Sequence, residues 1–533
     1  MNCGHVIRKS GRYSADNVAV WFDGASMTYG QLYERSCRLV NVLLDLGIAP
    51  QDRVATLGPN NMWSLEEIAG LALGGFVRIP LHYRNTVDLH LFMISHVGAR
   101  TLVVDEPRYR ELADRLDEVP SLELVLVHGL ADAGGGTGDG DRRRVRVLDY
   151  ERLLRTVRPD DPEIVVHPDD MLHMAFTSGT TGRPKATVQT HRSWLNVTAE
   201  NMIMLRPITG DDRYLAAGPL SHAASTIIFA LLAKAAGNVV MASFEPRRAA
   251  ELIEQYRATI TVLVPTMIQM LVSEPSTADR DLSSLQAVLA TGAPITERTI
   301  REAQGVLGDV LYLGFGQSEG IPATILTPAE IRSGLAADPS LLRSAGRCTP
   351  RSMVKILDED GNECPPGQQG EIAIDTPGNM KEIWGDPEAT ASRFTSEGFI
   401  LTRDIGYLDE RGYLFLADRK EDMIISGGFN IWPAEVENAV AAHPAVLEVA
   451  VVGVPHPKWG ETPRAVVVLR AGRTATEDEI VQWCRDRIGS MKKPTSVAFR
   501  TQPLPKSPVG KLLRRVVREQ EWPADAGSMI GGA

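Results

Sequence analysis

The sequence predicts an α/β protein with more than one domain, and three observations support this prediction. The chain has 533 residues, which is too long for one hydrophobic core. Short apolar runs alternate with helical patterns as far as Val310–Leu313. After Arg351 the pattern changes to short strands separated by turn signals such as Asp358–Gly361. We therefore expect parallel sheets covered by helices on both faces, followed by a small antiparallel or barrel-like region and a C-terminal unit.

The alternation begins with a helix start signal near the N-terminus. Thr28 and Gln31 have the spacing of a capping box, and Leu32, Leu39 and Leu43 follow at helical spacing. A regular succession of extended and helical stretches comes next. These stretches are Val54–Leu57, Ser64–Leu73, Phe76–Leu81, Thr101–Val104, Leu122–Val127, Leu172–Phe176, Val239–Ala242, Ile260–Val264, Ala287–Ala290 and Val310–Leu313.

The chain from Arg419 onward has the pattern of a compact α+β unit. Its expected elements are a helix at Pro433–Ala442, strands at Leu447–Val452 and Arg464–Leu469, and a helix at Glu477–Ile488.

Composition excludes several classes of protein. The formal net charge of −11 comes from 56 basic and 67 acidic residues, so the chain has no general attraction for nucleic acid or anionic membranes. The five cysteines show no metal-ligand spacing and are expected to be free thiols in a reducing cytoplasm. Met1–Ser14 contains no apolar segment typical of a secretion signal. Lys234 and Asn238 interrupt the apolar stretch Ala223–Met241, which favours a buried core helix over a membrane span.

A glycine-rich loop follows one of the predicted strands. Thr177–Ala186 (TSGTTGRPKA) comes after Leu172–Phe176 and before an expected helix near Ser193. Glycines let main-chain N–H groups approach an anion closely, and Lys185 adds a positive charge. A Walker P-loop requires G-x-x-x-x-G-K-[ST], whereas here only two residues separate the glycines and Ala186 follows the lysine. A Thr/Gly-rich turn is the alternative, and the length of the motif argues against it.

The loop resembles the [ST]-S-G-[ST]-T-G-x-P-K-[GA] motif of the adenylate-forming superfamily, which includes acyl-CoA synthetases, aryl-CoA ligases, luciferases and peptide-synthetase adenylation domains. The resemblance covers nearly the whole chain, with further motifs in the family's order. It implies that this loop binds the phosphates of ATP. The nucleotide-binding residues implied in the loop are Thr177, Ser178, Gly179, Thr180, Thr181, Gly182 and Lys185.

The resemblance also implies the domain organisation. We expect a large N-terminal adenylation domain, residues 1–420, made of two α/β sheet subdomains and a distorted β-barrel. A small mobile α+β C-terminal domain, residues 421–533, would follow. Glu421 lies at the family's hinge position.

A second motif, Gly314–Glu319, follows the apolar run Val310–Leu313. Glycines at the end of a strand leave room for a ligand, and Glu319 offers a hard oxygen ligand for Mg²⁺. The segment resembles the family's aromatic-Gly-x-[ST]-Glu motif, which implies that Glu319 binds the metal, Ser318 contacts phosphate and Phe315 lies against adenine. Other nucleotide-binding residues expected here are Gly292, Ala293, Pro294, Gly314, Gly316 and Gln317.

The remaining motifs lie toward the C-terminus. Asp404, in Thr402-Arg403-Asp404, matches the aspartate that holds the ribose hydroxyls, and a carboxylate can accept from both hydroxyls. The resemblance implies that Arg419 contacts ribose or phosphate and that Lys511 is the adenylation lysine. The residues expected to bind coenzyme A are Gly427, Gly428, Phe429 and Trp459. For Trp459, a hydrophobic cover on the small domain is an equally weighted alternative.

The acid is expected to bind near His222. The implied acyl-pocket residues are His222, Ala223, Ala224, Thr291, Gly292, Gly314 and Gly316. The residues directly after His222 are small, where aryl-CoA ligases often carry a larger side chain, so we expect a roomy pocket for a bulky cyclic acid. The implied catalytic residues are Lys511, His222 and Glu319.

These residues together predict an acid:CoA ligase with ATP, Mg²⁺ and coenzyme A as cofactors. The expected small-molecule partners are coenzyme A and either a carboxylic acid or its acyl-adenylate. The sequence leaves open whether the protein forms a homodimer. Arg403 and Glu421 depart from the family pattern, so an enzyme limited to the thioesterification half-reaction remains an alternative. The sequence also leaves open the loading of a carrier-protein thiol, luciferase-type oxidation and an ATP- or AMP-binding regulator. The regulator is disfavoured by four intact residues, Lys185, Glu319, Asp404 and Lys511.

Overall fold

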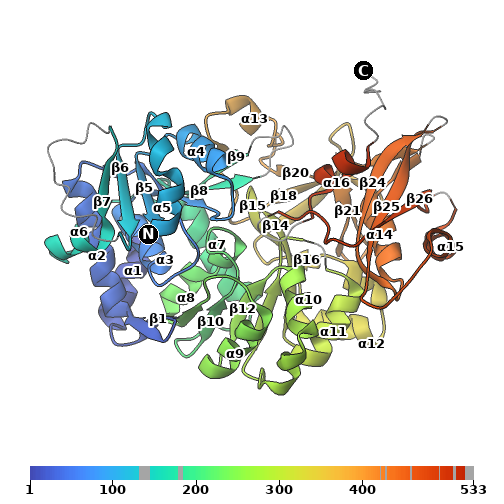
Figure 1. Ribbon diagram of the computed structural model, residues 1–533, viewed down its shortest axis with the longest axis horizontal. Helices are drawn as coiled ribbons and strands as arrows, with labels where there is room; N and C mark the ends of the chain where they lie inside the picture. Colours follow the sequence, from blue (N-terminus) through green and yellow to red (C-terminus); the bar gives the residue numbers. More distant parts are fainter. Residues whose placement is uncertain are drawn as a thin grey trace.

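The computed structural model describes residues 1–130, 144–177, 184–293, 295–419, 422–426, 429–456, 459–490, 492–507 and 512–522, with the backbone alone at 418–419, 425, 429–430 and 460. Four β-sheets run through the described residues. The first two are large and helix-covered, and the smaller third and fourth sheets lie toward the C-terminal end of the chain (Figure 1).

The first sheet is mainly parallel. Its strands, in spatial order, are β19 (Glu382–Ile383), β9 (Lys185–Thr190), β8 (Met171–Thr177), β4 (Val77–Leu81), β3 (Arg53–Leu57), β5 (Thr101–Asp105), β6 (Leu124–His128) and β7 (Arg146–Asp149). β9 pairs antiparallel with both β8 and β19 at one edge. Because β3 has β4 on one side and β5 on the other, the chain reverses its direction of winding at the carboxyl end of β3.

The second sheet has a parallel centre and antiparallel edges. Its strands, in spatial order, are β16 (Arg347–Cys348), β15 (Gly320–Leu326), β14 (Leu311–Gln317), β13 (Ala287–Ala290), β12 (Ile260–Leu263), β10 (Arg213–Ala216), β11 (Gly237–Val240), β1 (Val18–Phe22) and β2 (Ala25–Thr28). The antiparallel pairs are β14–β15, β15–β16 and β1–β2.

Helices cover both faces of the two large sheets (Figure 1). Around the first sheet these are α2 (Tyr29–Asp45), α3 (Ser64–Gly74), α4 (Val87–His96), α5 (Glu106–Leu112) and α6 (Tyr150–Thr156). Around the second sheet they are α1 (Cys3–Tyr13), α7 (His191–Met204), α8 (Ile228–Lys234), α9 (Pro246–Tyr256), α10 (Pro265–Ser273), α11 (Glu297–Leu307) and α12 (Pro328–Ala336). The 3₁₀ turns are η1 (Ala113–Glu118), η2 (Ala223–Ser225), η3 (Pro275–Asp279) and η4 (Pro339–Arg343).

The layer between the two large sheets is the most buried part of the fold. Every residue of α3 is buried, as expected for a helix enclosed on all sides. Asn60 links the layers directly, because its amide nitrogen donates to the carbonyls of Gly218 (2.8 Å) and Met241 (3.1 Å). Its amide oxygen accepts from the backbone of Leu220 at 2.8 Å. The loop after β10 is therefore fixed to the first sheet.

The third sheet is antiparallel throughout and forms the barrel-like region. Its strands are β17 (Met353–Leu357), β18 (Gly370–Asp375), β20 (Ile400–Leu408) and β21 (Leu414–Arg419). The short helix α13 (Pro387–Ala391) lies between β19 and β20 in the sequence.

The fourth sheet belongs to the C-terminal α+β unit. Its strands are β23 (Phe429–Ile431), β22 (Ile424–Ser426), β25 (Gly460–Leu469), β24 (Val446–His456) and β26 (Ser496–Arg500). Its helices are α14 (Pro433–Ala441), α15 (Glu477–Ile488) and α16 (Arg514–Glu521). Trp432 donates its indole N–H to Gln369 at 3.0 Å, so this unit contacts the third sheet.

The predicted fold class is confirmed, and so are several local predictions. Thr28 and Gln31 form the capping box that starts α2. The helix predicted at Glu477–Ile488 is α15, and all five cysteines are free thiols. Within the described ranges, the helices are too short or too polar to cross a bilayer.

The prediction of a single core helix over Ala223–Met241 is wrong. The segment forms η2, α8 and β11 instead. The helix ends because Ala235 adopts a left-handed backbone with φ of 54°. The β-branched pair Val239 and Val240 then enters the second sheet, where Asn238 donates to the carbonyl of Ala19 at 2.9 Å.

Candidate active site

The ends of the glycine-rich loop are held in a β-hairpin. Thr177 ends β8 and Lys185 begins β9, and the two residues pair across the strands. Lys185 Nζ lies 3.0 Å from Asp386 Oδ2, with both side chains partly exposed. Ser178–Gly182 lies outside the described residues. The helix expected near Ser193 is α7, and β9, which the sequence did not predict, lies between this helix and the loop.

Glu319 lies in the tight turn between β14 and β15. A Cβ atom on Gly316 would lie 2.8 Å from Ile321 Cγ2, so glycine is needed for this close approach. Gln189 donates to the carbonyl of Ser318 at 2.9 Å, and Met380 N–H donates to the carbonyl of Glu319 at 2.7 Å. The turn is thus fixed by segments from two other parts of the chain.

A buried arginine links the candidate metal ligand to the candidate ribose ligand. Arg393 is only 6% exposed, and its Nη2 lies 3.0 Å from Glu319 Oε1 and 3.5 Å from Gln317 Oε1. Gln317 Nε2 donates to Asp404 Oδ2 at 2.6 Å and to the carbonyl of Thr402 at 2.9 Å. Glu319, Arg393, Gln317 and Asp404 therefore form one hydrogen-bonded chain.

Arg393 was missed by the sequence analysis. A lone arginine in the polar segment before β20 carries no periodic or motif signal, and its importance comes from burial against Glu319. Burial lowers the pKa of Arg393, and Arg403 lowers it further, whereas Glu319 opposes the shift. The guanidinium nonetheless keeps its charge at neutral pH, because an arginine pKa starts far above 7.

The residue before Asp404 has an unusual backbone. Arg403 has φ of 61°, in the left-handed region where a side chain is strained and glycine is favoured. Its N–H donates to Glu371 Oε1 at 3.1 Å, and Asp404 N–H donates to Thr402 Oγ1 at 3.1 Å. This geometry explains physically why a small residue suits position 403.

The chemistry of the donor set can be compared with the needs of Mg²⁺. Magnesium in nucleotide sites uses one or two carboxylates together with phosphate oxygens. Glu319 supplies one carboxylate, and within the described ranges no group of three or more His, Cys, Asp or Glu side chains could hold a metal by itself. The donors therefore fit a metal that binds together with ATP, with Glu319 as its protein ligand.

The residues predicted for the acyl pocket lie at the carboxyl ends of β10, β13 and β14 in the second sheet, in which β12 separates β10 from β13. The loop carrying His222 follows β10, whereas Thr291 and Gly292 follow β13. Ala224 approaches Gly218, since a Cβ on that glycine would lie 3.3 Å from Ala224 Cβ. Carboxyl ends of parallel strands are the usual place for ligands in such sheets.

His222 is held as a neutral imidazole. Its Nδ1 lies 2.9 Å from Ser221 Oγ, and the centres of its ring and the His82 ring are 5.3 Å apart. Burial lowers the pKa of His222 to about 4, with a further contribution from the positive charge of Arg78. At neutral pH His222 can therefore shape the pocket and accept or donate one hydrogen bond, but it does not supply a positive charge.

Several predicted residues lie outside the described residues. These are Ser178, Gly179, Thr180, Thr181, Gly182, Pro294, Glu421, Gly427, Gly428 and Lys511. At Arg419 and Phe429 only the backbone is described, and Arg419 pairs with Asp404 across β20 and β21. Phe315 is partly buried and packs against the core of the third sheet. Trp459 is 41% exposed and stacks on His456 with ring centres 4.5 Å apart.

Comparisons with known proteins agree with this site. A family model described as AMP-binding enzyme matches residues 7–384, and one described as AMP-binding enzyme C-terminal domain matches residues 435–511. A feruloyl-CoA synthase from an Amycolatopsis species is 34% identical over 519 residues, covering 96% of this chain and 97% of that protein. The fatty acid–[acyl-carrier-protein] ligase ScoC of Streptomyces coeruleorubidus is 32% identical over 511 residues, covering 95% and 93%. The crystal structure of ATP-bound MatB from Rhodopseudomonas palustris superimposes with a TM-score of 0.86 at 26% identity, covering 98% of this chain and 99% of that one.

The two family models together span most of the chain, in the order that the motifs predicted. The prediction of a ligase that forms carbon–sulfur bonds, with ATP, Mg²⁺ and coenzyme A as cofactors, is confirmed. The chain belongs to the AMP-binding enzymes of the adenylate-forming superfamily, in their acyl-CoA ligase branch.

Proposed function

We propose that the protein joins a bulky cyclic carboxylic acid to coenzyme A through an acyl-adenylate. The main support is the series of hydrogen bonds that joins Glu319, Arg393, Gln317 and Asp404. It holds the predicted metal and ribose carboxylates together, and Gln189 links the Glu319 turn to β9, the strand that follows the glycine-rich loop. An acid-activating site needs this combination, because it must position the ribose and the phosphates of one ATP molecule together.

The proposed reaction has two steps. In the first, a carboxylate oxygen of the acid attacks the α-phosphorus of ATP, so that an acyl–O–P bond forms and pyrophosphate leaves. In the second, the thiol of coenzyme A loses its proton and attacks the acyl carbon, and AMP leaves with the electrons of the broken C–O bond. Lys511, Lys185 and Glu319 would position the phosphates and neutralise their charge.

The proposal includes the division of the chain into residues 1–420 and 421–533, with Glu421 as hinge. Rotation of the small domain would bring Lys511 to the site for the first step and the segment around Gly427 for the second. Trp459 would stack on the adenine of coenzyme A, because its side chain is substantially exposed and aromatic rings stack on bases.

The size of the acid pocket is the basis for proposing a cyclic acid. Small side chains at Ala223 and Ala224 after His222 leave space for a ring system, and the feruloyl-CoA synthase acts on an aromatic acid. The thiol that accepts the acyl group has one alternative to coenzyme A, the thiol of a carrier protein. The similarity to ScoC, a fatty acid–[acyl-carrier-protein] ligase, favours this alternative.

Two assays on one preparation test the proposal. Acid-dependent exchange of pyrophosphate into ATP reports the first step, and coenzyme A-dependent release of AMP from a synthetic acyl-adenylate reports the second. We expect both signals with cyclic acids and weaker signals with acetate. A second signal without the first would identify an enzyme limited to thioesterification, and neither signal with any acid would favour an ATP- or AMP-binding regulator.

Variants assign the two steps to residues. Lys511→Ala should abolish pyrophosphate exchange while thioesterification of the synthetic acyl-adenylate persists, and Lys9→Ala, at an exposed lysine, is the matched control. Trp459→Ala should raise the KM for coenzyme A and leave exchange unchanged. Equal turnover with a holo-carrier protein and with coenzyme A would instead support the carrier-protein alternative.

A cytoplasmic location and a homodimer also remain part of the proposal. The free cysteines, of which Cys3, Cys37 and Cys484 are buried, suit a reducing compartment. The mass of the particle in solution, measured by light scattering, decides between monomer and dimer.

A further inference from the structure

A cationic side chain lies in the buried layer between the two large sheets. Arg78 is at the centre of the first sheet, where it pairs in register with Val54 of β3 and His173 of β8. It is only 8% exposed. Arginine is almost never buried to this degree unless it is paired, because removing an unpaired charge from water is costly.

The protein gives Arg78 little compensation. Its Nη1 and Nη2 lie 3.4 and 3.5 Å from the carbonyl of Leu220, which are long hydrogen bonds, and its Nε is buried with no hydrogen-bond partner. Among the described residues, no carboxylate lies within ion-pair distance of it. Burial lowers the pKa of Arg78 to about 10, with Glu67 opposing the shift, so the group is still charged at neutral pH.

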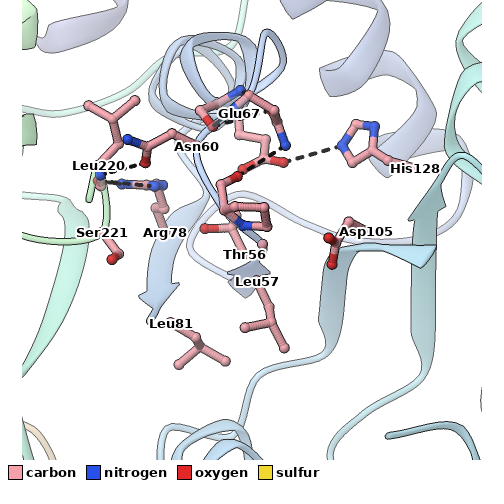
Figure 2. A pocket seen from close by; sticks show the side chains of 14 residues that line it. Thr56, Leu57, Asn60, Glu67, Arg78, Leu81, Asp105, His128, Leu220 and Ser221 are labelled. Atoms are coloured by element: carbon pink, nitrogen blue, oxygen red, sulfur yellow. Dashed lines mark hydrogen bonds and ion pairs between the residues drawn. The ribbon is translucent and has the colours of Figure 1, made fainter. Parts of the chain in front are cut away.

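Arg78 lines a small polar cavity at the carboxyl end of β3, where the first sheet reverses its direction of winding (Figure 2). Figure 2 shows the surrounding side chains, with a dashed line from Glu67 to His128, whose atoms Oε1 and Nε2 lie 3.2 Å apart. The other ring nitrogen of His128, Nδ1, is buried without a partner. The unpartnered Nε–H of Arg78 is therefore a buried donor at this cavity that can bind an oxygen atom.

The cavity adjoins the proposed acid pocket. Ser221 lines the cavity, and its hydroxyl lies 2.9 Å from Nδ1 of His222, the first residue of the proposed acyl pocket. Leu220, whose carbonyl contacts Arg78, precedes Ser221 on the same loop. The loop Leu220–His222 therefore carries one residue that contacts Arg78 and one residue of the proposed acyl pocket.

Size and charge select the ligand group. A water-sized group can move its centre over about 20 Å³ of the cavity, and one water needs about 10–15 Å³ on this measure, so one oxygen atom fits and a complete cofactor does not. Glu67 and Asp105 also line the cavity. A third carboxylate would be repelled by these two, whereas an uncharged carbonyl oxygen can accept from Arg78 without that repulsion.

We propose that Arg78 donates a hydrogen bond to an oxo group at the far end of the acid, so that the preferred substrates are oxo-substituted cyclic carboxylic acids. This inference rests on the proposed acid-activating function and specifies its substrate class. Arg78 is then a specificity-determining residue that binds the acyl group without taking part in the bond-making steps.

The test compares matched acids on the wild-type enzyme by kcat/KM of acid-dependent pyrophosphate exchange. One pair is 3-(4-oxocyclohexyl)propanoic acid and 3-cyclohexylpropanoic acid, and a fused two-ring pair places the oxo group farther away. We expect the oxo acid to be favoured roughly 10- to 150-fold in at least one pair, the range for a hydrogen bond from a charged donor. Equal values in both pairs overturn the inference without any variant.

Arg78→Met should reduce this preference, the ratio of kcat/KM for the oxo acid to kcat/KM for the unsubstituted acid, to near unity. The same substitution at the exposed Arg84 is the matched control and should keep the preference. A preference that survives in Arg78→Met overturns the assignment to Arg78. A matched dicarboxylate favoured over the oxo acid, or activation by chloride in place of an acid preference, overturns the assignment of a neutral oxo group.

The same data keep the inference separate from the proposed function. Exchange with the unsubstituted acids and no oxo preference would retain the ligase and remove the oxo specificity. No exchange with any of these acids counts against the proposed ligase, and the inference falls with it.

Discussion

The guanidinium of Arg393 lies 3.0 Å from Oε1 of Glu319, so the predicted metal ligand is already engaged by a buried cation. Side-chain exposure is 7% for Arg393 and 13% for Glu319. A buried pair of this kind is little screened by water, so a Mg²⁺ ion bound at Glu319 would share the carboxylate with an arginine.

Arg393→Met is expected to lower the Mg²⁺ concentration needed for ATP binding by roughly tenfold. At an effective dielectric of about 20, a single and a double positive charge about 5 Å apart repel by roughly 7 kcal/mol. Loss of an outer partner that orients the carboxylate costs only about 10- to 100-fold in metal affinity. Repulsion therefore dominates, although ATP phosphates reduce the net effect.

Calorimetric titration of ATP at several Mg²⁺ concentrations checks this expectation. Arg192→Met, which removes the exposed pair with Asp169, is the control and should not change the Mg²⁺ requirement. A higher Mg²⁺ requirement in Arg393→Met would show that orientation of Glu319 matters more than repulsion.

Asp386→Asn is expected to tighten ATP binding about two- to fivefold. If Lys185 binds phosphate as proposed, it would exchange Asp386 for a phosphate oxygen when ATP binds, and a partly exposed ion pair is worth about 0.2–1 kcal/mol. Asparagine keeps the cap of α13, because Oδ1 of Asp386 accepts from Ala389 N–H while Oδ2 contacts Lys185.

Equilibrium binding of ATP measures this effect, with Asp338→Asn as control. Asp338 caps η4 in the same way and pairs with Arg411 at the surface. Unchanged or weaker ATP binding in Asp386→Asn would show that the pair does not compete with phosphate.

Arg403→Gly is expected to be more stable than Arg403→Ala by about 1 kcal/mol. Both variants remove the same guanidinium, so their difference isolates the backbone, and alanine retains the Cβ that is strained at φ of 61°. Urea unfolding of the two variants measures the difference in free energy.

The pair Arg257→Gly and Arg257→Ala is the matched control, because Arg257 is exposed and has φ of 49°. A similar difference at both positions supports backbone strain as the cause. An Arg403→Ala variant as stable as Arg403→Gly would rule it out.

The protein is expected to lose stability as the pH falls from 6.5 toward 3, in part through His173. Burial lowers the pKa of His173 to about 3, with a further contribution from Arg78. Between its folded and unfolded pKa values, only the unfolded state binds the proton, so stability is present above pH 6.5 and is lost below it. At pH 5 this one group removes about 2 kcal/mol.

His173→Leu should therefore reduce the dependence of the unfolding free energy on pH between 7 and 5 by up to one proton, measured by urea unfolding at several pH values. His167→Leu, at an exposed position, should keep the wild-type slope. An unchanged slope in His173→Leu would mean that this imidazole titrates alike in both states.

Local patterns made much of the fold predictable. The cap at Thr28 and the helix at Glu477–Ile488 each depend on residues close together in sequence. The strand β9 after the glycine-rich loop was missed because a short polar–apolar run there, Lys185–Thr190, gains its structure from pairing with β8.

The two buried arginines were not predictable for the same reason. Nothing near Arg78 or Arg393 in the sequence distinguishes them from surface arginines, which are far more common. Their significance arises when β4 and the segment before β20 bring them against Leu220 and Glu319, which are distant in sequence.

The amide of Asn60 has a consequence for building hybrid enzymes. One side chain holds the backbone at Gly218, Leu220 and Met241, so the loop that carries His222 takes its position from the opposite sheet. A graft of residues 218–225 into another scaffold should therefore carry Pro59–Asn61 with it. The position of this loop thus depends on two segments that are distant in the gene.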